Sequence, residues 1–97
     1  MTVLQSLKIK DVFEADRPRE RLIRQGAESL SNQELLAIIL RTGTKEESVL
    51  TLANRVLFEF EKLHALKHAT LEELTKIKGV GEVKAVQLLA TIELSNR

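Results

Sequence analysis

Apolar positions in this chain recur at intervals of three and four residues, the spacing of helices that pack on a core. The clearest example surrounds two glycines near the C-terminus, Gly79 and Gly81. Because a single residue separates them, the chain must reverse within a few residues, and glycine permits the backbone angles that this needs. The pattern predicts a helix-hairpin-helix over residues 71–95. Its apolar positions are Leu71, Leu74 and Ile77 before the glycines and Ala85, Leu88, Leu89 and Ile92 after them.

An earlier helix is predicted between Asp16 and Gly26. Asp16 suits an N-cap, Pro18 is tolerated in a first helical turn, and Gly26 suits a C-terminal stop. Residues 1–15 show no helical stripe, although residues 7–12 alternate like a short strand without a partner. We therefore expect residues 1–15 to be a partly ordered leader.

Two further helices are predicted in the middle of the chain. Ser31 and Glu34 form a capping-box pattern in front of six consecutive apolar residues, 35–40. Such a run could be a buried strand, but the capping box and the lack of a hairpin partner favour a buried helix. From Lys45 a long helix is predicted, because a broad apolar stripe runs through residues 49–60.

A short turn and a second capping box lead to the glycine pair. Leu63 and Leu66 predict a turn that covers the core, and Thr70 with Glu73 repeats the capping-box spacing. Together these elements predict an all-α fold, a compact bundle of about five helices. We expect residues 16–97 to form one domain.

The predicted hairpin is also a candidate anion site. The backbone amides of Gly79, Val80 and Gly81 are expected to point outward together at the positive N-terminal end of the second helix. Lys78 precedes them and Lys84 lies in the first turn of the helix, so both can reach the same anion. One nucleic-acid phosphate is the usual ligand of such a hairpin. Two observations leave the alternative of a purely structural connection open. A lone Gly-x-Gly is a weak signal, and the charge of Glu82 competes with a phosphate.

The first long helix pair weakly resembles the second. Each pair begins with Glu-Leu and places an isoleucine at the same interval, although the glycines are one residue out of register: Glu34, Leu35 and Ile38 match Glu73, Leu74 and Ile77. The first pair is therefore a candidate degenerate copy, in a paired helix-hairpin-helix unit. In that case Gly43, Thr44 and Lys45 would hold a second phosphate. The alternative is an ordinary helix–helix connection.

Three arginines lie along one face of the helix expected after Asp16. They are Arg17, Arg21 and Arg24, and they are candidates for additional phosphate contacts. The favoured interpretation is a solvated helix face on which Glu20 pairs with Arg24, because charged faces are common on soluble helices.

Composition limits the possible functions. The 97 residues carry a net charge of +1 without a basic arm, so nucleic-acid binding would be local and weak. Three phenylalanines are too few for a base-stacking platform. The absence of cysteine suits a reducing compartment, and no apolar run is long enough to span a membrane. We expect a cytoplasmic location.

Candidate catalytic or metal-ligating residues are sparse. His64 and His68 are four residues apart, the interval that places two imidazoles on one helix face. No third ligand is evident, so two exposed histidines near a helix end are the better interpretation. We find no nucleophile elbow or other catalytic constellation and expect this chain not to be an enzyme.

Several longer strings resemble the N-terminal region of the RadC family, in the same order and over roughly residues 7–97. They are Asp16-Arg17-Pro18-Arg19-Glu20-Arg21-Leu22, Gly26-Ala27-Glu28-Ser29-Leu30-Ser31, Glu34-Leu35-Leu36-Ala37-Ile38-Ile39-Leu40-Arg41-Thr42-Gly43-Thr44, Ile77-Lys78-Gly79-Val80-Gly81 and Lys84-Ala85-Val86-Gln87-Leu88-Leu89-Ala90. The first and third strings are specific, whereas many DNA-binding families share the hairpin.

The resemblance implies a bacterial protein associated with DNA repair, in which this domain precedes a zinc-dependent JAB/MPN-type domain. The zinc-ligand pattern of that domain is absent here, so we expect this chain to be a truncated part without hydrolase activity. We expect no cofactor; in similar helix-hairpin-helix modules a monovalent cation near the hairpin can assist phosphate binding. Lys78 stands where many such hairpins have proline.

The sequence therefore predicts a module that binds the DNA backbone without reading bases, since phosphate contacts carry no sequence information. The alternative is a protein-interaction or positioning domain that docks onto the absent JAB/MPN domain or another partner. In that case the hairpin is only structural. Balanced charge favours the alternative, and Gly79-Val80-Gly81 with Lys84 favours DNA.

Overall fold

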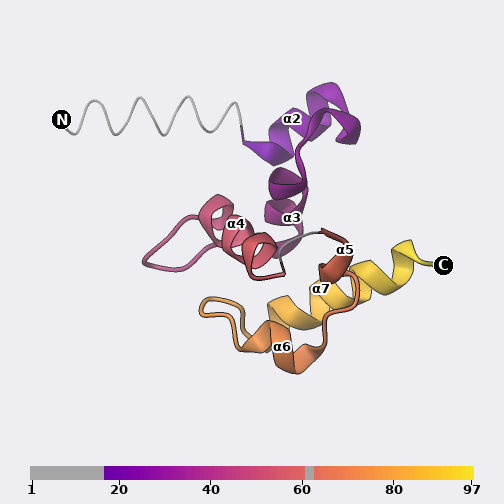
Figure 1. Ribbon diagram of the computed structural model, residues 1–97. Helices are drawn as coiled ribbons and strands as arrows, with labels where there is room; N and C mark the ends of the chain where they lie inside the picture. Colours follow the sequence, from indigo (N-terminus) through magenta and orange to yellow (C-terminus); the bar gives the residue numbers. More distant parts are fainter. Residues whose placement is uncertain (1–16, 61–62) are drawn as a thin grey trace. The chain divides into compact units, whose positions relative to one another are not determined.

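The computed structural model describes residues 17–60 and 63–97, and every regular element in these ranges is helical (Figure 1). The predicted leader, the strand-like alternation at 7–12 and the Asp16 N-cap lie outside the described residues. The chain divides into two units, residues 1–31 and 32–97. Each is described by itself below.

The first unit contains helix α2, Pro18–Gln25, followed by the short 3-10 helix η1, Ala27–Ser29. Pro18 occupies the first turn of α2, as predicted. The helix ends at Gly26, whose φ of 89° favours glycine and whose amide donates to the Leu22 carbonyl at 2.8 Å. The chain then folds back, because Arg21 Nη2 donates to the Ser29 carbonyl at 3.2 Å.

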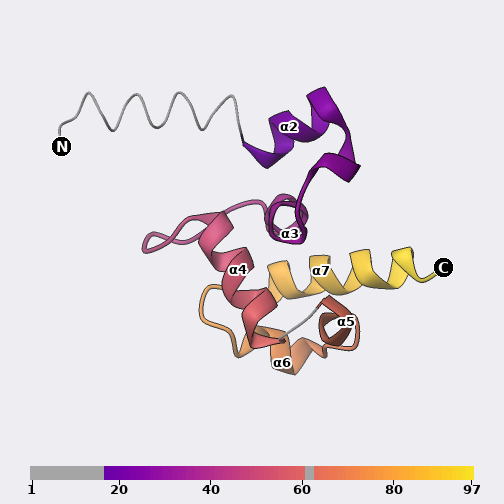
Figure 2. The ribbon, with the colours of Figure 1, turned by 45° about the horizontal axis from the view of Figure 1, so that its top comes forward.

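The second unit packs five helices around one apolar core. In chain order they are α3 (Asn32–Leu40), α4 (Val49–Glu59), α5 (Leu63–Leu66), α6 (Leu71–Thr75) and α7 (Glu82–Ser95). Helix α3 packs against both α4 and α7, and α6 packs against α7 (Figure 2). The buried cluster draws on every helix: Leu36, Ala37, Leu40, Leu52, Ala53, Val56, Leu66, Leu74, Ile77, Val80, Ala85 and Leu88.

The capping signals place two of these helices correctly. Helix α3 begins one residue after Ser31, where the first capping box predicted a helix start. At α6 the box is complete: the Glu73 amide donates to Thr70 Oγ1 at 3.1 Å, and the Thr70 amide donates to Glu73 Oε1 at 3.0 Å. These bonds satisfy amides that a helix start leaves without partners.

The helix predicted from Lys45 begins instead at Val49, so this boundary was wrong by four residues. A polar turn takes the place of the first helical turn. Thr44 Oγ1 accepts from the amides of Glu46 and Glu47, each at 3.2 Å, and the Thr44 amide donates to the Glu47 carbonyl at 2.9 Å. Ser48 then caps α4 by accepting from the Thr51 amide at 3.1 Å. The apolar stripe marks the helix, but the hydroxyl of Thr44 keeps the preceding residues out of it.

The predicted all-α fold is confirmed. Within the described ranges the chain forms six α-helices and one 3-10 helix, without a strand. None of the described helices combines the length and apolar character that a membrane span requires. The predicted domain boundaries and the proposed duplication of the helix pair stay predictions.

Candidate nucleic-acid interface

The connection between α6 and α7, residues 76–81, is a tight turn anchored in the core. The Ile77 amide donates to the Leu74 carbonyl at 3.1 Å, and the Val80 amide donates to the Ile77 carbonyl at 2.9 Å. The side chains of Ile77 and Val80 are both buried. These two apolar side chains therefore anchor the turn in the core.

The two glycines of this turn serve different purposes. Gly79 has a φ of 97°, which side chains rarely tolerate, and a Cβ there would meet Leu52 Cδ1 at 3.0 Å and Thr44 Cγ2 at 3.2 Å. Gly81 has an ordinary φ of −85°, and a Cβ there would meet nothing within 4 Å. Gly79 is therefore required by the fold, whereas Gly81 leaves open space in front of α7.

The amides around Gly81 remain available for an external acceptor. Val80 donates within the turn, but Gly79 and Gly81 have no acceptor among the described residues. Gly81 is the N-cap of α7 and offers no side-chain oxygen to the amides of the first turn, residues 82–84. Helix α7 has 14 residues, and its aligned peptide dipoles give its N-terminus a partial positive charge. This positive end coincides with the group of unpaired donors.

The side chain of Lys84 forms hydrogen bonds within the protein that the sequence did not predict. Its Nζ donates to the Leu40 carbonyl and to Thr42 Oγ1, both at 2.9 Å. Leu40 is the last residue of α3, so the ammonium binds the negative end of that helix. Lys84 thus joins the start of α7 to the end of α3.

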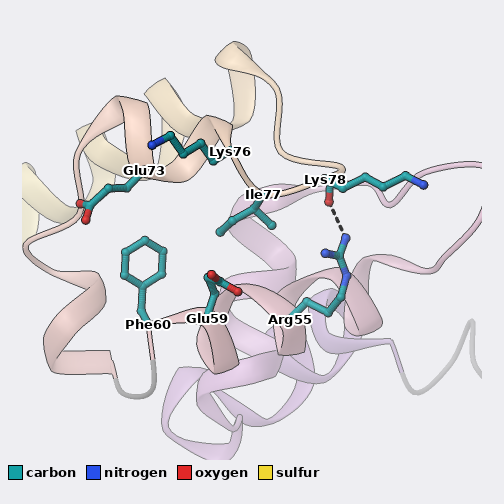
Figure 3. Close-up of a pocket in the computed structure, with 7 residues that line it drawn as sticks. All are labelled: Arg55, Glu59, Phe60, Glu73, Lys76, Ile77 and Lys78. Carbon is teal, nitrogen blue, oxygen red and sulfur yellow. Dashed lines mark hydrogen bonds between the residues drawn. The ribbon is translucent and has the colours of Figure 1, made fainter.

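Arg55 of α4 joins the same two regions from the other side. Its guanidinium forms a salt bridge with Glu47, with Nε 3.1 Å from both carboxylate oxygens, and Nη2 donates to the Lys78 carbonyl (Figure 3). The hydrogen bonds from Arg55 lower the pKa of the Glu47 carboxyl, and the positive charges of Arg55 and Lys78 add to this effect. Sequence analysis missed this pair because residues eight apart in a loop and a helix leave no periodic signal.

These contacts place the two helix–helix connections, residues 41–48 and 76–81, side by side. Lys84, Arg55 and the close approach of Thr44 to Gly79 all bridge them. Both connections lie on the left in Figure 1 and in Figure 2. Lys78 is exposed, and its side chain extends away from those of Ile77 and Glu59 (Figure 3).

The first connection offers fewer free donors than the sequence suggested. The amides of Thr44, Glu46 and Glu47 are used inside the turn, and a Cβ on Gly43 would lie 2.2 Å from the Glu47 carbonyl oxygen. Lys45 is exposed. Of the three candidates, the Thr44 amide is used internally, whereas the amides of Gly43 and Lys45 have no acceptor among the described residues. This connection can therefore offer an anion the charge of Lys45 and these two amides.

The arginine candidates belong to the first unit. Arg17 and Arg24 are exposed, and Arg21 is bonded to the Ser29 carbonyl. Their additional contact with DNA stays a prediction.

An open groove beside the hairpin lies between α4 and α6. Its volume is about 400 Å³, and Figure 3 shows the residues that line it: Arg55, Glu59, Phe60, Glu73, Lys76, Ile77 and Lys78. Two acidic and three basic side chains line the groove together with Phe60 and Ile77, and Lys76 Nζ lies 3.6 Å from Glu72 Oε1. The mixed charge does not favour an anion, so the candidate phosphate site is the hairpin rather than the groove.

The two histidines lie on the surface. His64 and His68 are both exposed, and their ring centroids are 5.3 Å apart in an edge-to-face arrangement. No group of three or more potential metal ligands occurs among the residues described.

Comparisons with known proteins identify the family. The family model for the UPF0758 N-terminal region matches residues 9–86. A UPF0758 protein of Geobacillus sp. (strain WCH70) is 64% identical over 89 residues, which cover 92% of this chain and 39% of that protein. UPF0758 protein YsxA of Bacillus subtilis is 58% identical over 91 residues, 94% of this chain and 39% of YsxA. No solved structure matches.

The chain spans about two-fifths of the length of these curated relatives. The extent of the family match and the high identity confirm the resemblance drawn from the sequence strings. The chain therefore belongs to the UPF0758, or RadC, family and represents its N-terminal part.

Proposed function

We propose that this domain is a DNA-binding module without sequence specificity, and that the α6–α7 turn is a helix-hairpin-helix whose amides hold one backbone phosphate. The observation that carries the proposal is the set of unpaired amides at the open, uncapped start of α7. Phosphate oxygens fit such donors at the positive end of a helix. The domain then acts by binding rather than by catalysis.

Within this proposal, the five hairpin candidates divide into direct and indirect contributors to phosphate binding. We assign direct contact to the amides of Gly79 and Gly81, with the exposed Lys78 adding charge. Val80 and Lys84 act indirectly, because Val80 is buried and Lys84 is bonded to the end of α3. Their role is to hold the turn in position.

The affinity of such a site is limited. With one hairpin and support from Lys45 or the α2 arginines, we expect about two to four phosphate contacts, and log K falls with log salt by about 0.9 per contact. The slope is therefore shallow, and the affinity is micromolar or weaker at physiological salt. A monovalent cation bound beside the hairpin would assist without adding specificity.

The test is a titration with duplex DNA at two salt concentrations, followed by backbone amide NMR shifts. We expect shifts centred on residues 79–84 that shrink at the higher salt. In the Gly81→Val variant, the new side chain has room but shields the amides, so binding falls at least about tenfold while helical content stays unchanged. The matched control is Lys67→Gln, which removes an exposed charge from the connection between α5 and α6.

Unchanged binding by Gly81→Val, or shifts that avoid residues 79–84, would contradict the proposal. The alternative function, a protein-interaction domain with a purely structural hairpin, predicts that DNA causes no shifts at these residues. It also predicts shifts that appear only when a protein partner is added.

A further inference from the structure

Helix α7 carries a second apolar face that its own unit leaves uncovered. The face, here called the outer stripe, consists of Val83, Val86, Ala90 and Leu94, all exposed. The exposed fractions are 78% for Val83, 52% for Val86 and 76% for Leu94. At about 100° per residue, the four side chains fall within an arc of about 80° and extend about 16 Å along the helix.

The outer stripe lies opposite the face that packs on the core. The core-facing residues of α7 are Ala85, Leu88, Leu89 and Ile92. A surface helix normally places charged or polar residues on the side away from the core. Three Val or Leu side chains in one line on that side are therefore a feature that the fold of residues 32–97 does not explain.

We propose that the outer stripe is the docking surface for the part of the full-length protein that follows this N-terminal region. The relatives are about two and a half times as long as their match to this chain, and the matched region is their N-terminal part. Leu94, at one end of the stripe, lies three residues before Arg97. Chain that follows Arg97 therefore starts beside the surface.

The size of the stripe favours a tethered occupant over a second copy. At roughly 100 Å² per Val or Leu side chain, it offers about 300 Å², whereas a stable interface buries about 800 Å² on each partner. A covalently linked domain needs less area, because the linker raises its effective concentration to the millimolar range. Contacts between domains of one chain are accordingly small and adjustable.

The test measures whether the stripe is covered in the full-length protein. A single cysteine is introduced as Ala90→Cys, in a background without other cysteines, and its reaction rate with a maleimide is compared between residues 1–97 alone and the full-length protein. We expect at least a tenfold slower reaction in the full-length protein. The matched control, Asn54→Cys on an exposed position of α4, reacts at the same rate in both.

Two further substitutions test whether the outer stripe, rather than another exposed apolar residue, is the surface that is covered. Adding Leu94→Glu to Ala90→Cys should restore fast reaction of the introduced thiol in the full-length protein, whereas Phe58→Glu, at another exposed apolar residue of α4, should not. Equal rates for the Ala90→Cys thiol in both proteins would overturn the proposal. Two results with residues 1–97 alone would also overturn it. Protection of the thiol that grows with protein concentration would indicate that a second copy covers the stripe, and protection that disappears when residues 1–31 are removed would indicate that the first unit covers it. None of these readouts involves DNA, so the inference stands or falls independently of the proposed function.

Discussion

The two helix–helix connections of the second unit lie side by side but differ in whether a side chain accepts from the amides at the start of the following helix. In residues 41–48, here called the closed connection, the Thr44 and Ser48 side chains accept from the amides of Glu46, Glu47 and Thr51. Residues 76–81 begin α7 with a glycine that has no side chain to offer, and the first amides stay open. A turn between two helices therefore does not by itself leave the first amides of the second helix without partners. The identity of the cap residue decides whether the donors are used internally or left for a ligand.

The two connections are also joined by side-chain hydrogen bonds. The closed connection supplies Thr42 and Glu47, which orient Lys84 and Arg55, and those two side chains in turn hold α7 and the Lys78 carbonyl. We infer that the closed connection holds residues 76–81, the open connection, in position. Changes in the first should lower stability, whereas changes at Gly81 should lower binding only.

The largest expected effect is at Gly43. In Gly43→Ala the new Cβ would lie 2.2 Å from the Glu47 carbonyl oxygen and 2.6 Å from the Ser48 carbonyl carbon, so backbone must move. We expect a loss of about 3 kcal/mol in the free energy of unfolding, measured by urea denaturation with circular dichroism. Gly81→Ala is the matched control and should change it by less than about 0.5 kcal/mol. Equal losses in both variants would erase the distinction between the connections.

A smaller loss is expected at Gly79. Gly79→Ala forces a side chain into a backbone with a φ of 97° and brings the Cβ to 3.0 Å from Leu52 Cδ1, an atom at the end of a flexible side chain. Since the neighbour can move, the cost is mainly the backbone conformation, about 2 kcal/mol in the same denaturation experiment. A stability equal to that of the unchanged protein would show that the turn adopts another conformation in solution.

Removing one hydroxyl should partly open the closed connection. Thr44→Val keeps the methyl group that faces Gly79 but leaves the amides of Glu46 and Glu47 without their acceptor. We expect a loss of about 1 kcal/mol, measured as a lower urea midpoint. Thr91→Val is the control, because that hydroxyl bonds only to a carbonyl within its own helix. A loss as large in the control would mean that the cap itself contributes nothing.

The smallest expected effect is a dependence of stability on acid pH. Because Arg55 lowers the pKa of the folded Glu47 carboxyl below its ordinary value of 4.5, the ion pair stabilises the fold fully above about pH 4.5. The contribution disappears as the pH falls through the lowered pKa. Thermal unfolding between pH 6 and pH 3 should therefore show a smaller decrease in midpoint for Glu47→Gln than for the unchanged protein. Parallel curves would show that the pair does not form in solution.

Local sequence signals predicted most of the fold because the forces behind them are local. Pro18 and Gly26 bound α2, and the hydroxyl–carboxylate pair Thr70 and Glu73 starts α6. The three-and-four spacing identified the buried side of α7. The same rules missed the start of α4, because a threonine hydroxyl can stabilise either a helix or a turn, and only packing selects between them.

For the candidate site too, some features follow from the local sequence and others depend on tertiary packing. By itself the sequence determined that a sharp reversal at Gly79–Gly81 precedes a long helix, since steric limits on φ and apolar periodicity are properties of a short stretch. Only the tertiary structure decided which amides stay open, that Lys84 is bonded to the end of α3, and that Arg55 reaches the Lys78 carbonyl. Lys84 is bonded to a carbonyl 44 residues away, and Arg55 to one 23 residues away. Contacts over such separations depend on how the helices pack, which no local pattern encodes.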